Sequence, residues 1–307
     1  MEIGLYAESA GLRDLDETLR RAAALGITRI EMSTGGQCSA PFLDANRLLA
    51  DASARRELLS KLEAHGLRFS ALNISAFPCH PVLGRDHTEL TRKTIRLANL
   101  LEVDRIIAQS GAPGDAEGSR VPNWVAYPWP DDMLDTVRRQ WDQVVTLWTD
   151  LAAYAREHGV RRICFELHPV NLVYNVPTLL RLREAVGEAI GANFDPSHLM
   201  WQGMDIPACV RALGKAVYHV HIKDVAMHPH NQALVGVIDN RPDVSFRERP
   251  WNFCTPGFGH DARWWRAFIV ALHDVGYDDV LSIENEDPYL PGIAGVERTA
   301  AFLRQVL

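Results

Sequence analysis

Four residues in the second half of the chain can each bind a divalent metal: Glu166, Asp195, His221 and Glu284. Each stands at the end of a short apolar run, in the order ICFE, IGANFD, VYHVH and VLSIE, and such runs are typical of buried strands. Three carboxylates and one imidazole suit Mn²⁺, Mg²⁺ or Co²⁺ better than a structural Zn²⁺, because no thiolate takes part. These residue types predict a site for one divalent cation, with Mn²⁺ as the expected ion.

Such a cation would have a definite chemical use. Four protein ligands leave two positions open on an octahedral ion, and adjacent carbonyl and hydroxyl oxygens of a substrate could fill them. The cation would polarise the carbonyl and hold the charge of an enediolate while a carbon-bound proton leaves. Isomerisation, epimerisation and β-elimination all begin with this step. A single acidic residue at a strand end is more often a helix cap or a surface carboxylate, but four ligands at regular intervals favour a shared site.

The spacing of these residues predicts how they come together. Glu166, Asp195 and His221 follow one another at intervals of about one strand-helix unit with its loops. The interval from His221 to Glu284 is longer because it contains Val225–Gly259, which is rich in His, Pro, Arg and aromatic residues and shows no helical period. In a parallel barrel the strand ends converge on one mouth, so the four side chains are expected to meet there.

Strand and helix patterns alternate eight times along the chain. The strand-like segments are Glu2–Tyr6, Thr28–Ser33, Leu67–Asn73, Val103–Ala108, Val160–Glu166, Ala189–Asp195, Ala216–Lys223 and Asp279–Glu284. Amphipathic stretches between them include Leu15–Leu25, Arg55–His65, Glu89–Leu101 and Leu134–His158. Several helices are expected to end at a left-handed glycine, namely Gly26, Gly66, Gly159 and Gly276. The alternation predicts an α/β fold, a (β/α)8 TIM barrel that forms a single domain over residues 1–307.

Three connections that follow strands are long, and all lie on the face where barrel loops build a site: Thr34–Ser53, Gly111–Met133 and Val225–Gly259. Their aromatic content predicts a lid or a pocket wall. Trp124, Arg247, His80 and His260 are candidates for substrate binding, with packing within a loop as the alternative. His198, three residues after Asp195, could contact the substrate or the metal, or could belong to a helix start.

Two further residues share strand faces with the expected ligands. Side chains two apart on a strand point to the same face, so His168 lies beside Glu166 at the mouth. The imidazole of His168 could take a proton near neutral pH, or it could orient a carboxylate. Lys223 could contact a substrate oxygen, or it could form an ion pair with Asp195 or Asp224.

Five motifs carry a resemblance to a known family: FELHP (165–169), NFDPSH (193–198), HVHIKD (219–224), FGHD (258–261) and SIENED (282–287). The N-terminal IEMSTGG and the HPVLG that follows NISAFPC extend it over nearly the whole chain. The chain resembles the xylose-isomerase-like TIM-barrel superfamily of sugar isomerases and epimerases. The resemblance implies that Glu166, Asp195, His221 and Glu284 bind one divalent metal, and that the two glutamates act as acid and base.

Some residues depart from the ketose 3-epimerase pattern. Ile222-Lys223-Asp224 follows the metal histidine, where those enzymes usually carry Gly-Glu. The chain also resembles the large subunits of C-glycoside deglycosidases, which implies β-elimination from 3-keto-glycosides with His168 beside the first glutamate. A third alternative is a non-catalytic sugar-binding barrel. The implied ligand is a small sugar or keto-glycoside. The implied assembly is a homo-oligomer or, for a deglycosidase, a complex with a small second subunit.

Composition and charge limit the other partners. A net charge of −7 over 307 residues argues against a general surface for nucleic acid or anionic membranes. The chain starts with MEIGLYAESA and contains no apolar stretch of 18 residues, so no membrane partner is expected. We therefore expect a cytoplasmic, metal-dependent sugar isomerase or epimerase, with the lyase as the first alternative.

Overall fold

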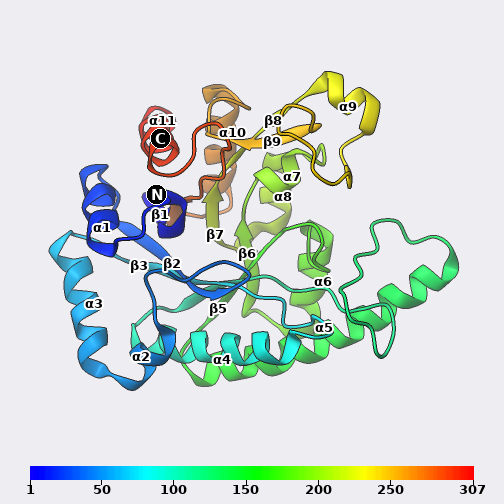
Figure 1. Ribbon diagram of the computed structural model, residues 1–307, viewed down its shortest axis with the longest axis horizontal. Helices are drawn as coiled ribbons and strands as arrows, with labels where there is room; N and C mark the ends of the chain where they lie inside the picture. Colours follow the sequence, from blue (N-terminus) through cyan, green and yellow to red (C-terminus); the bar gives the residue numbers. More distant parts are fainter. The chain divides into compact units, whose positions relative to one another are not determined.

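Eight parallel strands close into a barrel in the order β1, β10, β7, β6, β5, β4, β3, β2 (Figure 1). The computed structural model describes residues 1–307. The barrel strands are β1 (Glu2–Tyr6), β2 (Arg29–Gly36), β3 (Arg68–Ser75), β4 (Arg105–Ala108), β5 (Arg162–Glu166), β6 (Ile190–Phe194), β7 (Val217–Ile222) and β10 (Val280–Ile283). The predicted TIM barrel is confirmed, and each strand overlaps its predicted segment.

Helices follow the barrel strands along the chain. They are α1 (Leu15–Ala24), α2 (Ala45–Ala50), α3 (Ala52–Ala64), α4 (Gly84–Leu100), α5 (Asp131–Glu157), α6 (Val176–Val186), α7 (Ser197–Met200), α8 (Ile206–Leu213), α9 (Pro229–Val235), α10 (Ala262–Asp274) and α11 (Ile293–Val306), with short 3-10 turns η1 (Ala7–Ala10) and η2 (Gly214–Ala216). The predicted glycine caps are confirmed, because Gly26, Gly66, Gly159 and Gly276 all have positive φ. No helix combines the length and the apolar character needed to cross a membrane.

The chain divides into two compact units. The first comprises Met1–Ile30, His65–Arg68 and Asp195–Leu307, and the second comprises Glu31–Ala64 and Phe69–Phe194. The single domain expected over residues 1–307 stays a prediction. Within the first unit, β10 pairs with β1 and β7, and Ser282 lies opposite His221. Within the second unit, β5 pairs with β4 and β6, and Glu166 lies opposite Asn193.

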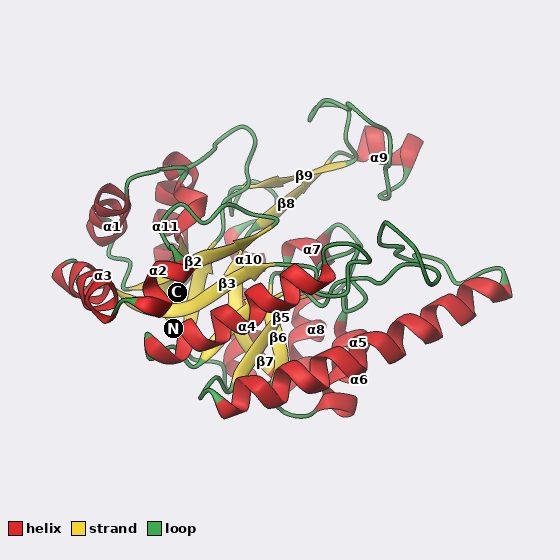
Figure 2. Ribbon diagram, turned by 60° about the horizontal axis from the view of Figure 1, so that its bottom comes forward, coloured by secondary structure: helices red, strands yellow, loops and turns green.

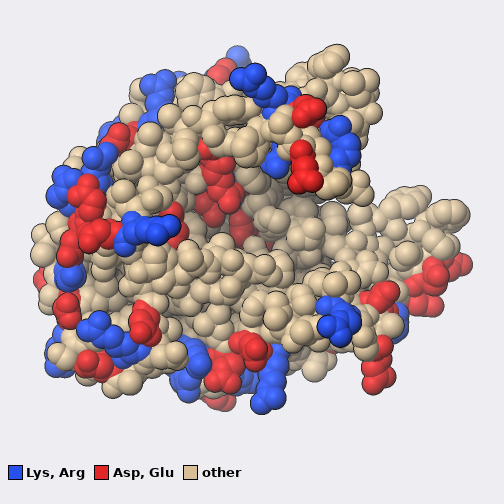
Figure 3. All heavy atoms as spheres, viewed as in Figure 1, with Lys and Arg blue, Asp and Glu red and all other residues tan.

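In the second unit, α4 and α5 lie side by side (Figure 2). Arg92 of α4 forms an ion pair with Asp150 of α5, and its guanidinium lies 4.5 Å from the centre of the Tyr154 ring. Over the face that Figure 3 shows, basic side chains lie mainly around the rim, and a group of acidic side chains lies near the middle.

The prediction that Val225–Gly259 lacks regular structure is wrong. In the first unit, β8 (Asp224–Met227) pairs in antiparallel fashion with β9 (Trp251–Cys254), and α9 lies between them in the chain (Figure 1). β8 begins only two residues after β7 ends, so this ribbon continues a barrel strand. The pattern was missed because each element is shorter than the windows in which helical or strand periods become visible. The connection Thr34–Ser53 likewise contains α2.

Asp224 holds the base of this ribbon. Its carboxylate is fully buried and accepts hydrogen bonds from the backbone N–H groups of Gly257, Gly259 and His260, at 3.0 to 3.2 Å. It also accepts from Trp265 Nε1 at 3.4 Å. A Cβ on Gly259 would lie 2.0 Å from the Val225 carbonyl oxygen, so only glycine fits where the loop meets the ribbon.

Replacing Asp224 with Asn should loosen this junction. The amide would face several N–H donors with an N–H group of its own, and we expect a loss of about 2 to 3 kcal/mol in unfolding free energy. Urea unfolding measures this loss. Asp261→Asn is the matched control, because Asp261 caps α10 by accepting from Trp264 N at 2.9 Å and Asn caps equally well. Equal stability of the two variants would contradict this role of Asp224.

A charge network at the start of β1 gives a second stability prediction. Glu2 accepts from Arg29 Nε and Thr28 Oγ1 at 2.9 Å, and from Arg68 at 2.7 Å. Its hydrogen bond with Arg29 lowers the pKa of Glu2 from 4.5 to about 2, against the opposing effect of burial. A lowered pKa in the folded state means that the stabilisation is present above pH 4.5 and is lost as the pH falls through about 2.

Glu2→Gln should therefore lower the melting temperature at pH 7, with a difference from wild type that shrinks as the pH falls below 4.5. Melting curves from pH 7 to pH 2.5 test this prediction. Glu57→Gln, which removes an exposed pair with Arg47 at 3.6 Å, should have little effect at any pH. A difference that grows towards acid pH would contradict the assignment.

Candidate functional site

Three of the four predicted metal ligands converge in the first unit. Asp195 directly follows β6, His221 lies on β7, and Glu284 directly follows β10. Each offers one ligand atom, and these atoms lie within 4.8 Å of one another. The pairing of β7 with β10 aligns two of them, because Ser282 lies opposite His221 and Glu284 N donates to Ile222 O. The three side chains form a cluster with the donor types of a divalent-metal site.

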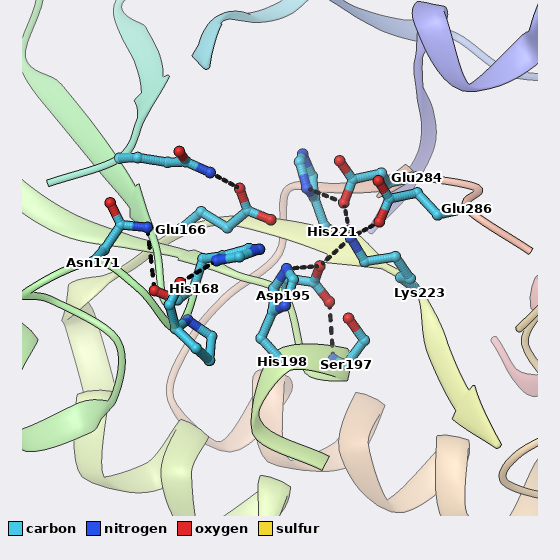
Figure 4. A network of polar contacts seen from close by, with 12 residues as sticks. Glu166, His168, Asn171, Asp195, Ser197, His198, His221, Lys223, Glu284 and Glu286 are labelled. Atoms are coloured by element: carbon cyan, nitrogen blue, oxygen red, sulfur yellow. Dashed lines mark hydrogen bonds and ion pairs between the residues drawn. The ribbon is translucent and has the colours of Figure 1, made fainter. Parts of the chain in front are cut away.

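Lys223 places its ammonium among the carboxylates of this cluster (Figure 4). Its Nζ lies 3.0 Å from Asp195 Oδ2, 2.6 Å from Glu284 Oε2 and 2.8 Å from Glu286 Oε2. The side chain of Lys223 is only 2 % exposed. A buried ammonium is stable only with paired anions, so Lys223 and these carboxylates hold one another in place. Lys223 thus forms an ion pair with Asp195, while Asp224 serves the ribbon junction.

The cluster is electrostatically unbalanced. Burial raises the pKa of Glu284, but the Lys223 ammonium and His221 outweigh this effect and keep that pKa well below its ordinary value. His221 Nδ1 donates to Glu284 Oε2 at 3.1 Å. Three carboxylates, those of Asp195, Glu284 and the half-exposed Glu286, face the ammonium of Lys223 and the imidazole of His221. This surplus of negative charge favours binding of a further cation.

Asp195 brings a fully buried carboxylate to the cluster. Its side chain is fully buried, and Oδ1 accepts from Ser197 N at 2.9 Å. Oδ2 accepts no hydrogen bond of normal geometry, although Lys223 Nζ and His198 Nε2 lie 3.0 and 3.3 Å away. A buried carboxylate oxygen usually has a well-aligned partner. The donor set therefore fits a divalent cation.

His198 lies within hydrogen-bonding reach of this cluster. Besides its contact with Asp195, its ring packs edge-on against Phe253 at 5.4 Å between ring centres. His198 belongs to the short helix α7, and it is almost completely buried. This position is consistent with a role in orienting Asp195.

The fourth predicted ligand, Glu166, ends β5 in the second unit. Its residue is 8 % exposed, and Gln109 Nε2 donates to its Oε2 at 3.4 Å. The register of β5 and β6 places Glu166 opposite Asn193, and Asp195 comes two residues after Asn193 in the chain. Glu166 is thus held at the carboxyl end of its strand, as the sequence predicts.

His168 follows Glu166 at the loop after β5. Its Nδ1 makes a short contact with the carbonyl oxygen of Pro169, and Asn171 Nδ2 donates to the His168 carbonyl at 3.2 Å (Figure 4). A carbonyl can only accept, so Nδ1 must carry the proton. In the neutral imidazole the lone pair then lies on Nε2, which is the form a general base requires.

Three of the four other predicted substrate residues have structural partners of their own. His260 Nδ1 lies 2.7 Å from Asp224 Oδ1, and Arg247 is exposed in the chain between α9 and β9. His80 Nδ1 accepts from the backbone of Val82 and Leu83, at 3.0 and 3.1 Å, where the chain enters α4. Burial and nearby His87 lower the pKa of His80. Trp124 packs edge-on against Tyr174 at 5.4 Å.

Two residues of the cluster were not predicted from the sequence. Glu286 contacts Lys223, and Phe253 lies under the Lys223 ammonium with its ring centre 4.6 Å from Nζ. Glu286 could have been found, because it lies two residues after Glu284 in the SIENED motif. Phe253 could not, because its position depends on the β8–β9 ribbon.

Two curated proteins match the chain in sequence. YfiH of Bacillus subtilis (strain 168) is 37 % identical over 311 residues, covering 100 % of this chain and 99 % of YfiH. The rhizopine catabolism protein MocC of Rhizobium meliloti is 36 % identical over 153 residues, covering 48 % of this chain and 44 % of MocC.

Solved structures share the fold at low sequence identity. The probable 3-DHS dehydratase AsbF of Bacillus anthracis has a TM-score of 0.69 at 17 % identity, with 99 % of both chains covered. The IOLI protein with a bound zinc atom has a TM-score of 0.68 at 19 % identity, covering 100 % of this chain and 98 % of IOLI. D-psicose 3-epimerase of Clostridium cellulolyticum H10, solved with D-tagatose, has a TM-score of 0.65 at 16 % identity, with 100 % and 98 % covered.

The fold comparisons agree with a match to a sequence family. The model of the family described as xylose isomerase-like TIM barrel matches residues 19–306, which is most of the chain. The confirmed resemblance rests on the barrel and on motifs at the ends of its strands. This chain belongs to the xylose isomerase-like TIM barrel family.

Proposed function

We propose that the protein is a divalent-metal-dependent sugar isomerase or epimerase that removes a proton from the carbon next to a sugar carbonyl. The observation that carries this proposal is the convergence of Asp195, His221 and Glu284, whose ligand atoms lie within 4.8 Å of one another. The acidic character of the cluster, with Asp195, Glu284 and the half-exposed Glu286, supports a cation as the missing component.

The proposed ligand set is Asp195, His221, Glu284 and Glu166. Glu166 is included because β5 neighbours β6 in the barrel and because it ends its strand level with Asn193, just before Asp195. The ion proposed is Mn²⁺, with Mg²⁺ and Co²⁺ as alternatives of the same oxygen preference. The zinc atom in the IOLI structure supports a divalent ion in this fold and makes Zn²⁺ a necessary comparison.

When bound, a divalent ion supplies Lewis-acid polarisation of the substrate carbonyl. His168 takes the carbon-bound proton on Nε2, since its Nδ1 proton is held by the Pro169 carbonyl. Glu166 and Glu284 are proposed as the acid and base of the second step, in which a proton taken up from solvent is returned to a substrate carbon and the proton on His168 is released to solvent. Lys223 keeps a positive charge beside Glu284 and holds that carboxylate in its ionised form.

The known relatives support a carbohydrate substrate. One structure with this fold is a D-psicose 3-epimerase with D-tagatose, and another is an L-ribulose 3-epimerase. A neighbour described as a probable dehydratase supports elimination as an alternative to consider. The second candidate function is therefore β-elimination from a 3-keto-glycoside, for which the support is the position of His168 two residues after Glu166. A barrel that binds sugars without catalysis is the remaining alternative.

Lys223 provides a test of the metal site that does not depend on turnover. Its ammonium occupies the carboxylate oxygens that a divalent ion would use, so the two cations should compete. We expect Lys223→Met to bind Mn²⁺ at least about ten-fold more tightly, a change equivalent to about 1.4 kcal/mol. The metal-free variant should melt at a lower temperature than wild type because the buried carboxylates lose their counter-ion.

Calorimetric titration with Mn²⁺ and Zn²⁺ measures these affinities. Lys215→Met, which removes an exposed lysine, is the control and should leave both affinities unchanged. Glu284→Gln should abolish binding, whereas Glu286→Gln, which removes a partner of Lys223 but no proposed ligand, should keep it. Metal affinity that is unaffected by Glu284→Gln would rule out the proposed site.

Proton exchange from D₂O tests the chemical step. With Mn²⁺ present, wild type should exchange the proton next to the carbonyl of at least one compound in a panel of ketoses and 3-keto-glycosides. His168→Gln should slow this exchange about 10² to 10⁴-fold without a change in metal affinity. NMR follows exchange and any released aglycone, which separates epimerase from lyase. Metal binding without exchange in any compound would favour the binding barrel.

A further inference from the structure

A cavity lies along the β8–β9 ribbon, within the first unit. Its volume is about 400 Å³, in the range of small-molecule sites. The lining includes Val237, Asp239, Arg241, Val244, Arg249 and Trp251. None of these residues belongs to the metal-ligand cluster.

The ribbon connects this cavity to the cluster. Trp251 and Phe253 are two apart on β9, so their side chains lie on the same face of the ribbon. Phe253 faces the Lys223 ammonium at 4.6 Å, and its ring centre lies 5.3 Å from that of Trp251. Phe253 and Trp251 therefore pack in series between the buried lysine and the wall of the cavity.

Trp251 is held in a defined orientation. One face of its indole stacks on Trp201, with 4.9 Å between ring centres and an angle of 6°. Its Nε1 donates to the Val237 carbonyl at 3.0 Å. Because the stacking covers one face and the hydrogen bond uses the only polar atom, what remains for a ligand is apolar aromatic surface.

The charged groups of the lining balance one another. Arg241 Nε and Nη2 bind the two oxygens of Asp239 at 2.8 and 2.7 Å. Asp243 and Arg249 add one charge of each sign, and the Arg249 guanidinium also lies 4.8 Å from the centre of the Phe246 ring. A lining without net charge, but with several hydrogen-bonding groups and one aromatic wall, suits a neutral hydroxylated ring.

We propose that this cavity binds the second ring of a glycoside whose sugar reacts at the cluster of Asp195, His221 and Glu284. The position of the reacting sugar rests on the proposed function, whereas binding of the second ring can be measured by itself. The substrate class is then a neutral glycoside carrying a hydroxylated ring, and a free monosaccharide would leave the cavity unused.

The probes are 4-hydroxyphenyl glucopyranoside and methyl glucopyranoside, each in both anomeric forms. Calorimetry should show that one 4-hydroxyphenyl anomer binds wild type on the order of ten-fold more tightly than its methyl counterpart. Val244→Trp fills the cavity and should remove this preference. Ile238→Trp is the matched control, since Ile238 is an exposed neighbour in the same segment outside the lining, and it should keep the preference.

Equal affinity of the two glycosides, absence of binding by both, or equal loss in the two tryptophan variants would each overturn the proposal. The Mn²⁺ affinity of Val244→Trp, measured in parallel, should equal that of wild type. If the preference is present but no compound exchanges protons, the proposed reaction fails and the cavity assignment stands. If exchange occurs without the preference, the reverse holds.

Discussion

The buried ammonium of Lys223 is the charge around which this molecule organises its acidic residues. Burying several carboxylates together is strongly unfavourable unless a cation accompanies them. Lys223 supplies that cation to Asp195, Glu284 and Glu286 at 2.6 to 3.0 Å. The remaining negative charge is the feature on which the proposed binding of a divalent cation depends.

The position of Lys223 follows from the continuity of one strand. β7 brings His221 into the barrel, Lys223 follows one residue after its end, and β8 begins at the next residue. One extended segment thus carries a proposed ligand, its counter-ion and the base of the ribbon. The buried Asp224 then joins the ribbon to the loop of Gly257, Gly259 and His260. The barrel and the ribbon are therefore connected by hydrogen bonds to Asp224 as well as by the continuous backbone.

Much of the fold could be predicted from local patterns. Apolar runs that end in Glu166, Asp195, His221 and Glu284 are sufficient to place four strand ends, because the pattern of a buried strand can be recognised from a few consecutive residues. The partners of Lys223 were only partly predictable, since its pairing with Asp195 depends on which strands are neighbours. The ribbon was missed for a similar reason: its antiparallel pairing joins residues far apart in sequence.

The loop residues proposed for substrate binding show more clearly what residue type alone cannot predict. His260 and His80 have the right chemistry for sugar hydroxyls, yet each uses Nδ1 in a bond that shapes its own loop. Residue type alone cannot separate these two uses. Phe253 has no polar group and no motif, and its place beside the ammonium is defined only by the register of Val225 with Phe253.

The chain between β8 and β9 is attached to the rest of the first unit by the paired strands and the Asp224 junction, while residues 228–250 lie beyond those anchors. Insertions, deletions or substitutions in this hairpin tip can alter its shape without shifting the register that holds the acidic residues. The shape of the hairpin tip and the positions of the acidic residues can thus vary independently. The shape of the proposed cavity can therefore change while the positions of the acidic residues stay the same.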